Sequence, residues 1–89
     1  MSKSTEDRRY LLHPDNPSGP YYQVVQRDSG WQWLWIEAGE AEDAGPVVET
    51  RADALWAAAQ DAEDTIDDDS GSGRRLANRL RLAARAVRS

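Results

Sequence analysis

The sequence predicts a small α+β protein: a three-stranded antiparallel sheet packed by one long helix and followed by a second, C-terminal amphipathic helix. Residues 21–38 are rich in aromatic and β-branched side chains, and a turn-forming triplet divides them into two runs, which predicts a β-hairpin. Two later stretches repeat apolar residues at spacings of three and four, which predicts two helices. A chain of 89 residues has room for one domain.

Residues 1–20 are predicted to form a partly ordered N-terminal arm. Three prolines and a glycine between residues 14 and 20 indicate an irregular connector. Before this connector, Tyr10, Leu11 and Leu12 form a short apolar group. We expect the arm to dock on the core through these three side chains.

Residues 21–66 are predicted to form a βββα core. Strands at 21–27 and 31–38 flank a three-residue connection, in which Gly30 supplies a left-handed conformation. A third strand is expected at 46–49, after an acidic loop at 39–45, because a proline at its start suits an edge strand. A helix follows at 50–66 with Thr50 as its cap, and its apolar stripe is expected to place Leu55 and Trp56 against the sheet.

Residues 67–73 combine three aspartates with glycine and serine, and they predict a flexible acidic linker. Residues 74–89 are predicted to form an arginine-rich helix, because leucine and alanine recur along one side of it. The helix could fold back beside the acidic helix so that charges pair within the protein or a dimer. Read alone, it resembles a helix that binds nucleic acid or a membrane surface.

The net charge of −5 conceals a separation of charge along the chain. Residues 37–69 hold twelve acidic side chains and one arginine, whereas residues 70–89 hold six arginines and no acid. Such an acidic face either is only solvated or engages a basic site on a partner, with association accelerated by electrostatic steering. The candidate partner-binding residues are Glu37, Glu40, Glu42, Asp43, Asp53, Asp61, Asp64, Asp67 and Asp68.

The sequence Trp-Gln-Trp-Leu-Trp forms a second candidate feature. Strand alternation places Trp31, Trp33 and Trp35 on one face of the sheet. One face must pack under the long helix, and the C-terminal helix or the arm could cover the other. If neither does, the tryptophan face is a candidate interface with a partner or a second copy.

Catalytic and metal-binding patterns are missing from the sequence. The chain has no cysteine, which excludes a thiolate site, and one histidine, which excludes a two-histidine metal site. That histidine, His13, precedes a proline in a predicted loop, so a conventional serine–histidine triad is not expected. We therefore expect no enzyme activity, no cofactor and no metal. No apolar run approaches the length of a membrane span or a signal peptide, and a cytoplasmic protein without membrane contact is expected.

Two resemblances add to this interpretation. Residues 22–64, with Gly30-Trp31 in the hairpin and an alanine-rich helix after Thr50, resemble small ββ(β)α domains of uncharacterised bacterial and phage proteins. In its length, acidity and lack of cysteine, the whole chain is similar to phage-encoded anti-CRISPR proteins of the small acidic, nucleic-acid-mimicking type. That resemblance implies a DNA mimic, acting in a bacterial host cell, that blocks target DNA recognition by a CRISPR effector complex subunit. The arginine-rich tail and the modest net charge depart from the type.

The functional prediction is thus a non-enzymatic inhibitor, monomeric or homodimeric, whose acidic surface occupies the basic nucleic-acid-binding site of another protein. Such a protein is not expected to bind nucleic acid itself. Two alternatives remain open. One is a small nucleic-acid-associated regulator that uses the arginine-rich helix, and the other is a homodimeric module that pairs through the tryptophan strand.

Overall fold

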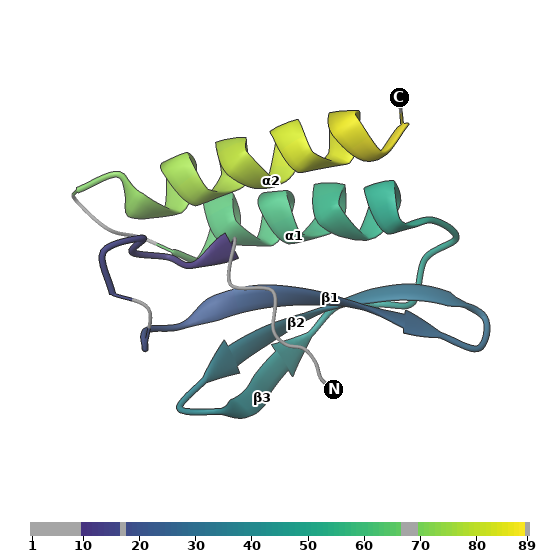
Figure 1. The fold of residues 1–89 in the computed structure, drawn as a ribbon, viewed down its shortest axis with the longest axis horizontal. Coiled ribbons are helices and arrows are strands. Elements are labelled where there is room, and N and C mark those ends of the chain that lie inside the picture. The colour runs from purple at the N-terminus through teal and green to yellow at the C-terminus, as the bar shows by residue number, and fades with distance from the viewer. Residues whose placement is uncertain (1–9, 17, 67–69, 89) are drawn as a thin grey trace.

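The computed structural model describes residues 10–16, 18–66 and 70–88, and these form three strands and two helices. The strands are β1 (Tyr21–Arg27), β2 (Gly30–Glu37) and β3 (Glu40–Ala44), and the helices are α1 (Arg51–Thr65) and α2 (Ser72–Arg88). The sheet is antiparallel with the order β1-β2-β3 (Figure 1). This is the α+β architecture that the sequence predicts.

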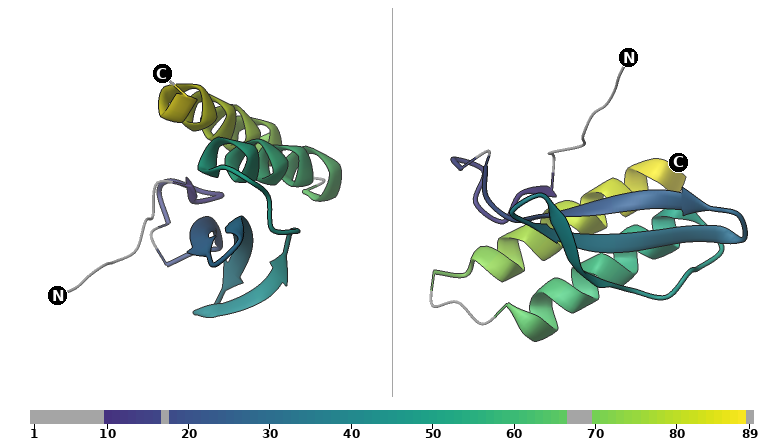
Figure 2. Two further views of the ribbon diagram at one scale, coloured as in Figure 1. Left: turned by 90° about the vertical axis from the view of Figure 1, so that its right-hand side faces the viewer. Right: turned by 90° about the horizontal axis from the view of Figure 1, so that it is seen from below.

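Helix α1 is the central layer of the molecule. It lies between the sheet on one side and α2 on the other (Figures 1 and 2), and among these elements α2 packs on α1 alone. Two buried faces are possible because most of the buried side chains of α1 are alanines, whose small size lets neighbouring backbones approach closely. Its buried residues are Ala52, Ala54, Leu55, Ala58, Ala59 and Ala62.

Aromatic side chains from the sheet and leucines from the helices fill the core. Tyr22 on β1 is buried and contacts two tryptophans of β2, with ring centroids 5.4 Å from Trp33 and 4.7 Å from Trp35. Leu76 and Leu80 of α2 complete the core from the opposite side of α1. The register pairs Tyr22 with Trp35 and Val24 with Trp33, so these side chains share one face of the sheet, and Trp33 and Trp35 pack in the core on that face.

The third strand lies earlier in the chain than the sequence pattern indicates. The prediction at 46–49 is wrong: β3 covers 40–44, because Ala38 and Gly39 form a two-residue turn that pairs the chain with β2 at once. Both turn residues have positive φ, as a type I′ hairpin turn requires. Val48 contributes only an isolated bridge to Trp31, through two backbone hydrogen bonds of 2.7 Å each.

The first hairpin and the start of α2 also differ from expectation. Gly30 pairs with Arg27, so the connection has two residues instead of three. A side chain on Gly30 would put its Cβ 2.0 Å from the carbonyl oxygen of Val48, so close approach of the backbone is what requires glycine here. Helix α2 begins at Ser72, inside the predicted linker, whose residues 67–69 lie outside the described residues.

The described part of the N-terminal arm docks on the core as predicted. Tyr10 and Leu11 are buried, and Leu11 forms a backbone bridge with Tyr21. Arg79 of α2 donates a hydrogen bond of 2.6 Å to the carbonyl oxygen of Leu11. Residues 1–9 and 17 lie outside the described residues. The arm therefore connects the start of β1 with α2.

Trp56 is the main exception to the predicted apolar stripe of α1. It is 47% exposed instead of packed against the sheet, whereas Leu55 beside it is fully buried. The guanidinium carbon of Arg81 lies 5.6 Å from the centroid of the Trp56 ring. The indole therefore lies at the outer side of the contact between α1 and α2, where a cation covers it.

Candidate functional site

Carboxylates from the sheet and from α1 converge at one place. Glu37 at the end of β2, Asp43 on β3 and Asp61 in the second half of α1 line one open pocket of about 400 Å³. The rest of its lining consists of two aromatic residues, Tyr22 and Trp35, together with Thr65 and Ile66. We call this cavity the acidic pocket. It unites three of the carboxylates that the sequence nominates.

A β-bulge brings Asp43 into the acidic pocket. Ile36 pairs with Ala41, but Trp35 pairs with Asp43, so Glu42 is an extra residue in β3. An unbroken ladder would place Glu42 opposite Trp35 and turn Asp43 to the other face of the sheet. The bulge therefore sets the Asp43 carboxylate beside the Trp35 ring on the face that carries α1. Oδ1 of Asp43 also accepts a hydrogen bond of 2.8 Å from the backbone N–H of Ala44.

Asp61 is fixed by a buried tyrosine. The Tyr22 hydroxyl donates a 2.5 Å hydrogen bond to Oδ2 of Asp61, which links β1 to α1 across 39 positions of sequence. Burial and then the Asp61 carboxylate raise the pKa of the Tyr22 hydroxyl far above its ordinary value. Tyr22 is therefore a permanent hydrogen-bond donor that holds one oxygen of Asp61 in place. The sequence analysis did not predict this role. The signal for it was a tyrosine on a strand that is expected to pack against a helix rich in aspartate.

The remaining acidic candidates are spread around the pocket or away from it. Glu40 and Glu42 are exposed on β3 and do not line the pocket, and Asp64 is exposed one turn beyond Asp61. Asp53 lies in the first turn of α1, where its backbone N–H donates to Oγ1 of Thr50 at 3.0 Å. Asp53 and Asp64 are eleven helical positions apart, an axial distance of about 16 Å, so Asp53 belongs to a different part of the surface. Asp67 and Asp68 lie outside the described residues.

The arginines of α2 leave the acidic pocket without a counter-charge among the described residues. The two helices pair at Arg81, whose Nη1 lies 2.6 Å from Oε2 of Glu63, and this contact lowers the pKa of Glu63. Pairing between the helices is thus found at Glu63, as one of the open alternatives expects. No described arginine or lysine lies within ion-pair distance of Glu37, Asp43 or Asp61.

The three tryptophans of β2 do not form an exposed face. Trp33 is buried in the core, while Trp31 and Trp35 are half-buried. The indole of Trp33 lies over Gly45, where an added Cβ would come within 2.0 Å of its Nε1 atom. Trp33 is therefore unavailable as a contact surface, which removes the central residue of the predicted aromatic interface. Of the three, Trp35 lines the acidic pocket.

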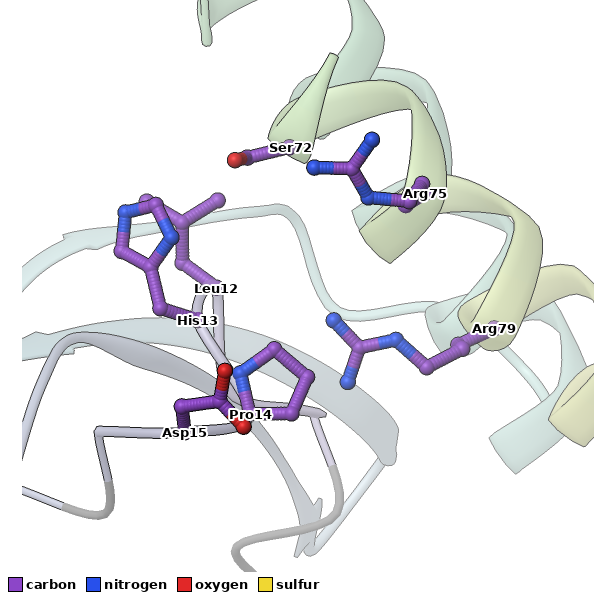
Figure 3. A pocket seen from close by; sticks show the side chains of 7 residues that line it. All are labelled: Leu12, His13, Pro14, Asp15, Ser72, Arg75 and Arg79. Carbon is purple, nitrogen blue, oxygen red and sulfur yellow. The ribbon is translucent and has the colours of Figure 1, made fainter. Parts of the chain in front are cut away.

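A second pocket, of about 250 Å³, lies between the N-terminal arm and the start of α2 (Figure 3). His13 and Asp15 line it from the arm, and Arg75 and Arg79 line it from α2. Arg75 donates to the carbonyl oxygen of Ser70 at 2.8 Å, while Arg79 bonds the arm at Leu11. Burial and then the charge of Arg75 lower the pKa of Arg79. These contacts give both arginines a structural role in fastening the arm and the helix start.

Within the described residues, no three His, Cys, Asp or Glu side chains are grouped so that they could hold a metal ion. Neither helix there is long and apolar enough to cross a membrane. Comparison with known proteins adds no further guidance, since the chain matches no protein-family model, no curated protein and no solved structure.

Proposed function

We propose that the protein is a non-catalytic binding protein whose acidic surface occupies the basic, nucleic-acid-binding site of a partner protein. The acidic surface consists of Glu37, Glu40, Glu42, Asp43, Asp61 and Asp64. The observation that supports the proposal is the convergence of carboxylates from the β2–β3 hairpin and from α1, with no described arginine paired to those in the pocket.

Electrostatic cost favours this proposal over simple solvation. Like charges on neighbouring strands or one helical turn apart repel each other and reduce stability. Glu37 and Glu40 are directly opposite each other in the ladder between β2 and β3, which is such an unfavourable pair. A basic partner site would relieve this repulsion on binding and would accelerate association by steering.

The spacing of the carboxylates fits a partner that otherwise binds nucleic acid. Asp61 and Asp64, three residues apart on α1, lie about 5–6 Å from each other, which is of the same order as the axial charge repeat of about 3.4 Å along one nucleic-acid strand. A CRISPR effector complex subunit is one candidate of this class, and it follows from the resemblance in type to anti-CRISPR proteins. Inhibition would then consist of occupying the site at which target DNA is recognised.

Capture followed by competition tests the proposal. The tagged protein is incubated with bacterial lysate at low and high salt, and captured proteins are identified by mass spectrometry. Each captured protein is purified and loaded with fluorescent duplex DNA, and the unlabelled protein is added as competitor while anisotropy is recorded. We expect displacement of the DNA, and we expect higher salt to weaken it because the contact is between charges.

Two triple variants separate the acidic surface from net charge. Glu37→Gln/Asp43→Asn/Asp64→Asn should weaken displacement at least about tenfold, because it removes charge at the contact. Asp15→Asn/Asp28→Asn/Glu49→Gln removes the same charge from exposed positions outside the acidic surface, and it should change displacement by less than about threefold. Equal losses in both variants would show that only overall charge matters, and the proposal would fail.

A second candidate function rests on the arginines of α2. Arg74, Arg75 and Arg85 are exposed, as a nucleic-acid-binding helix would need. This regulator function predicts that the protein alone raises the anisotropy of the labelled DNA, and that Arg74→Ala/Arg85→Ala abolishes the effect. Direct binding of this kind, without displacement from any captured protein, would favour the regulator over the inhibitor.

A further inference from the structure

The acidic pocket combines two kinds of wall. Aromatic rings of Tyr22 and Trp35 form one part of its lining, and carboxylates of Glu37, Asp43 and Asp61 form another. Its volume of about 400 Å³ falls within the range of small-ligand pockets. A ligand that matches both walls is positively charged and lies over an aromatic ring.

The protein already contains one occupied site of this composition. On the opposite flank of α1, Arg81 places its guanidinium carbon 5.6 Å from the centroid of the Trp56 ring and donates a 2.6 Å hydrogen bond to Glu63. In this fold, a guanidinium group that α2 positions is thus in contact with one indole and one carboxylate. The acidic pocket offers the half-buried indole of Trp35 and three carboxylates, and no described guanidinium group forms an ion pair with those carboxylates.

We infer that the acidic pocket is the receptor for an arginine side chain of the partner. The inference rests on the proposed function and specifies the contact at its centre: a guanidinium group stacks on Trp35 and donates hydrogen bonds to Asp43 and Glu37. An arginine that contacts a phosphate in the partner's nucleic-acid complex would supply this group, because carboxylate and phosphate oxygens accept the same paired N–H donors.

Arginine fits the pocket better than the other cations of proteins. Lysine presents a compact, strongly hydrated ammonium that neither stacks on a ring nor donates two parallel hydrogen bonds. A bare metal ion would need carboxylates gathered around one point, and the described carboxylates are not grouped in that way. They are distributed around an aromatic wall, as a flat and extended cation requires.

Peptide titration followed by NMR tests the inference without the macromolecular partner. The probe is an acetylated and amidated pentapeptide with one central arginine among glycines, and matched peptides carry lysine or citrulline at the same position. The indole N–H resonances of the four tryptophans are recorded, and that of Trp35 is assigned by its loss in Trp35→Phe. We expect the arginine peptide to shift the Trp35 resonance saturably, the lysine peptide to bind at least about threefold more weakly, and the citrulline peptide to cause no shift.

A matched pair of double variants on the β2–β3 hairpin locates the binding. Glu37→Gln/Asp43→Asn removes two pocket carboxylates and should weaken arginine-peptide binding at least about tenfold. Glu40→Gln/Glu42→Gln removes the same charge from the same hairpin outside the pocket, and it should weaken binding by less than about twofold. Retained chemical-shift dispersion in both variants verifies that each is folded.

Several outcomes would overturn the inference. It fails if the two double variants weaken binding equally, if lysine and arginine peptides bind alike, or if the Trp35 resonance does not move. These failures are distinct from failure of the proposed function, which is judged by displacement of DNA from a captured partner. Displacement of DNA without peptide binding at Trp35 would support the proposed function and reject the arginine receptor. Peptide binding at Trp35 without displacement of DNA would support the arginine receptor and reject the proposed function.

Discussion

The hydrogen bond between Tyr22 and Asp61 yields a quantitative prediction about stability and pH. Tyr22→Phe keeps the ring that contacts Trp33 and Trp35 but removes the hydroxyl that donates to Asp61 at 2.5 Å. A hydrogen bond to a charged group contributes about 1.5–3 kcal/mol. Because Asp61 is half-exposed and water can replace the lost donor, we expect the lower end of this range, about 1.5 kcal/mol at neutral pH.

The difference in stability between the wild type and Tyr22→Phe should disappear in alkaline solution. The folded protein raises the pKa of Tyr22 above its ordinary value of 10.0, chiefly by burial. The unfolded chain therefore releases this proton near pH 10 while the folded chain retains it, so the contribution of Tyr22 to stability is complete below pH 10 and declines above it. The decline is about 1.4 kcal/mol per pH unit. The free energies of unfolding of the two proteins should therefore become equal near pH ~11.

Urea denaturation followed by tryptophan fluorescence measures this prediction at several pH values between about 8 and 11. Tyr10 and Tyr21 are present in both proteins, so their titration cancels in the comparison. Asp61→Asn is the companion variant, since its amide oxygen still accepts from Tyr22 while the charge is lost, and it should be destabilised less than Tyr22→Phe. A difference between wild type and Tyr22→Phe that stays constant over the pH range would refute the reasoning.

Three further substitutions test other parts of the structure. Gly45→Ala should lower stability by about 2 kcal/mol in thermal unfolding, because its Cβ would come within 2.0 Å of Nε1 of Trp33; a loss below about 0.5 kcal/mol would contradict the packing. Ala38→Asn should raise stability by about 1 kcal/mol in urea denaturation, because Ala38 has a φ of 52° and asparagine tolerates that conformation better; a loss would exclude the type I′ turn. Glu63→Gln should make thermal stability fall less steeply as the solution is acidified. Arg81 lowers the pKa of Glu63 from its ordinary value of 4.5, so the ion pair stabilises the folded protein above that pH. This stabilisation is lost in acid as the carboxylate of the folded protein is protonated. Identical acid profiles for wild type and Glu63→Gln would count against the ion pair.

Much of the fold can be predicted because periodicity and turn chemistry agree along the chain. The long helix was predicted at 50–66 and spans 51–65, with the side chain of Thr50 accepting from the N–H of Asp53 as a cap does. The tryptophans were assigned to one face by strand alternation, and the observed register with β1 confirms this. Both features depend on local patterns that tertiary contacts reinforce.

The third strand could not be predicted by the same reasoning. Residues 40–44 read Glu-Ala-Glu-Asp-Ala, which has little strand propensity, and all five are exposed. Their pairing is fixed by the turn at Ala38 and Gly39, and a turn with alanine at a left-handed position carries no clear sequence signal. The neighbouring Pro-Val-Val segment has the stronger strand propensity, but only Val48 forms a bridge.

The candidate site was predicted in composition but not in arrangement. Helical spacing nominated Asp53 together with Asp61 and Asp64, whereas the structure separates Asp53 from the pocket and adds Tyr22 and Trp35 to it. The one-residue bulge at Glu42 determines which acid faces the pocket, and a bulge in an irregular acidic stretch cannot be read from residue types. The apolar pattern places Trp56 in the core because it treats the stripe of α1 as a single buried face, whereas the helix is covered on two sides.

The exposure of β3 has a consequence for how copies of the protein meet one another. A strand with only one neighbour offers its outer N–H and C=O groups to any extended chain, and such edges commonly nucleate intermolecular sheets. Glu40, Glu42 and Asp43 lie along this edge, so two antiparallel copies would bring like charges together and push apart. The negative charge of this strand therefore keeps an otherwise open sheet edge from pairing with a second copy of the protein.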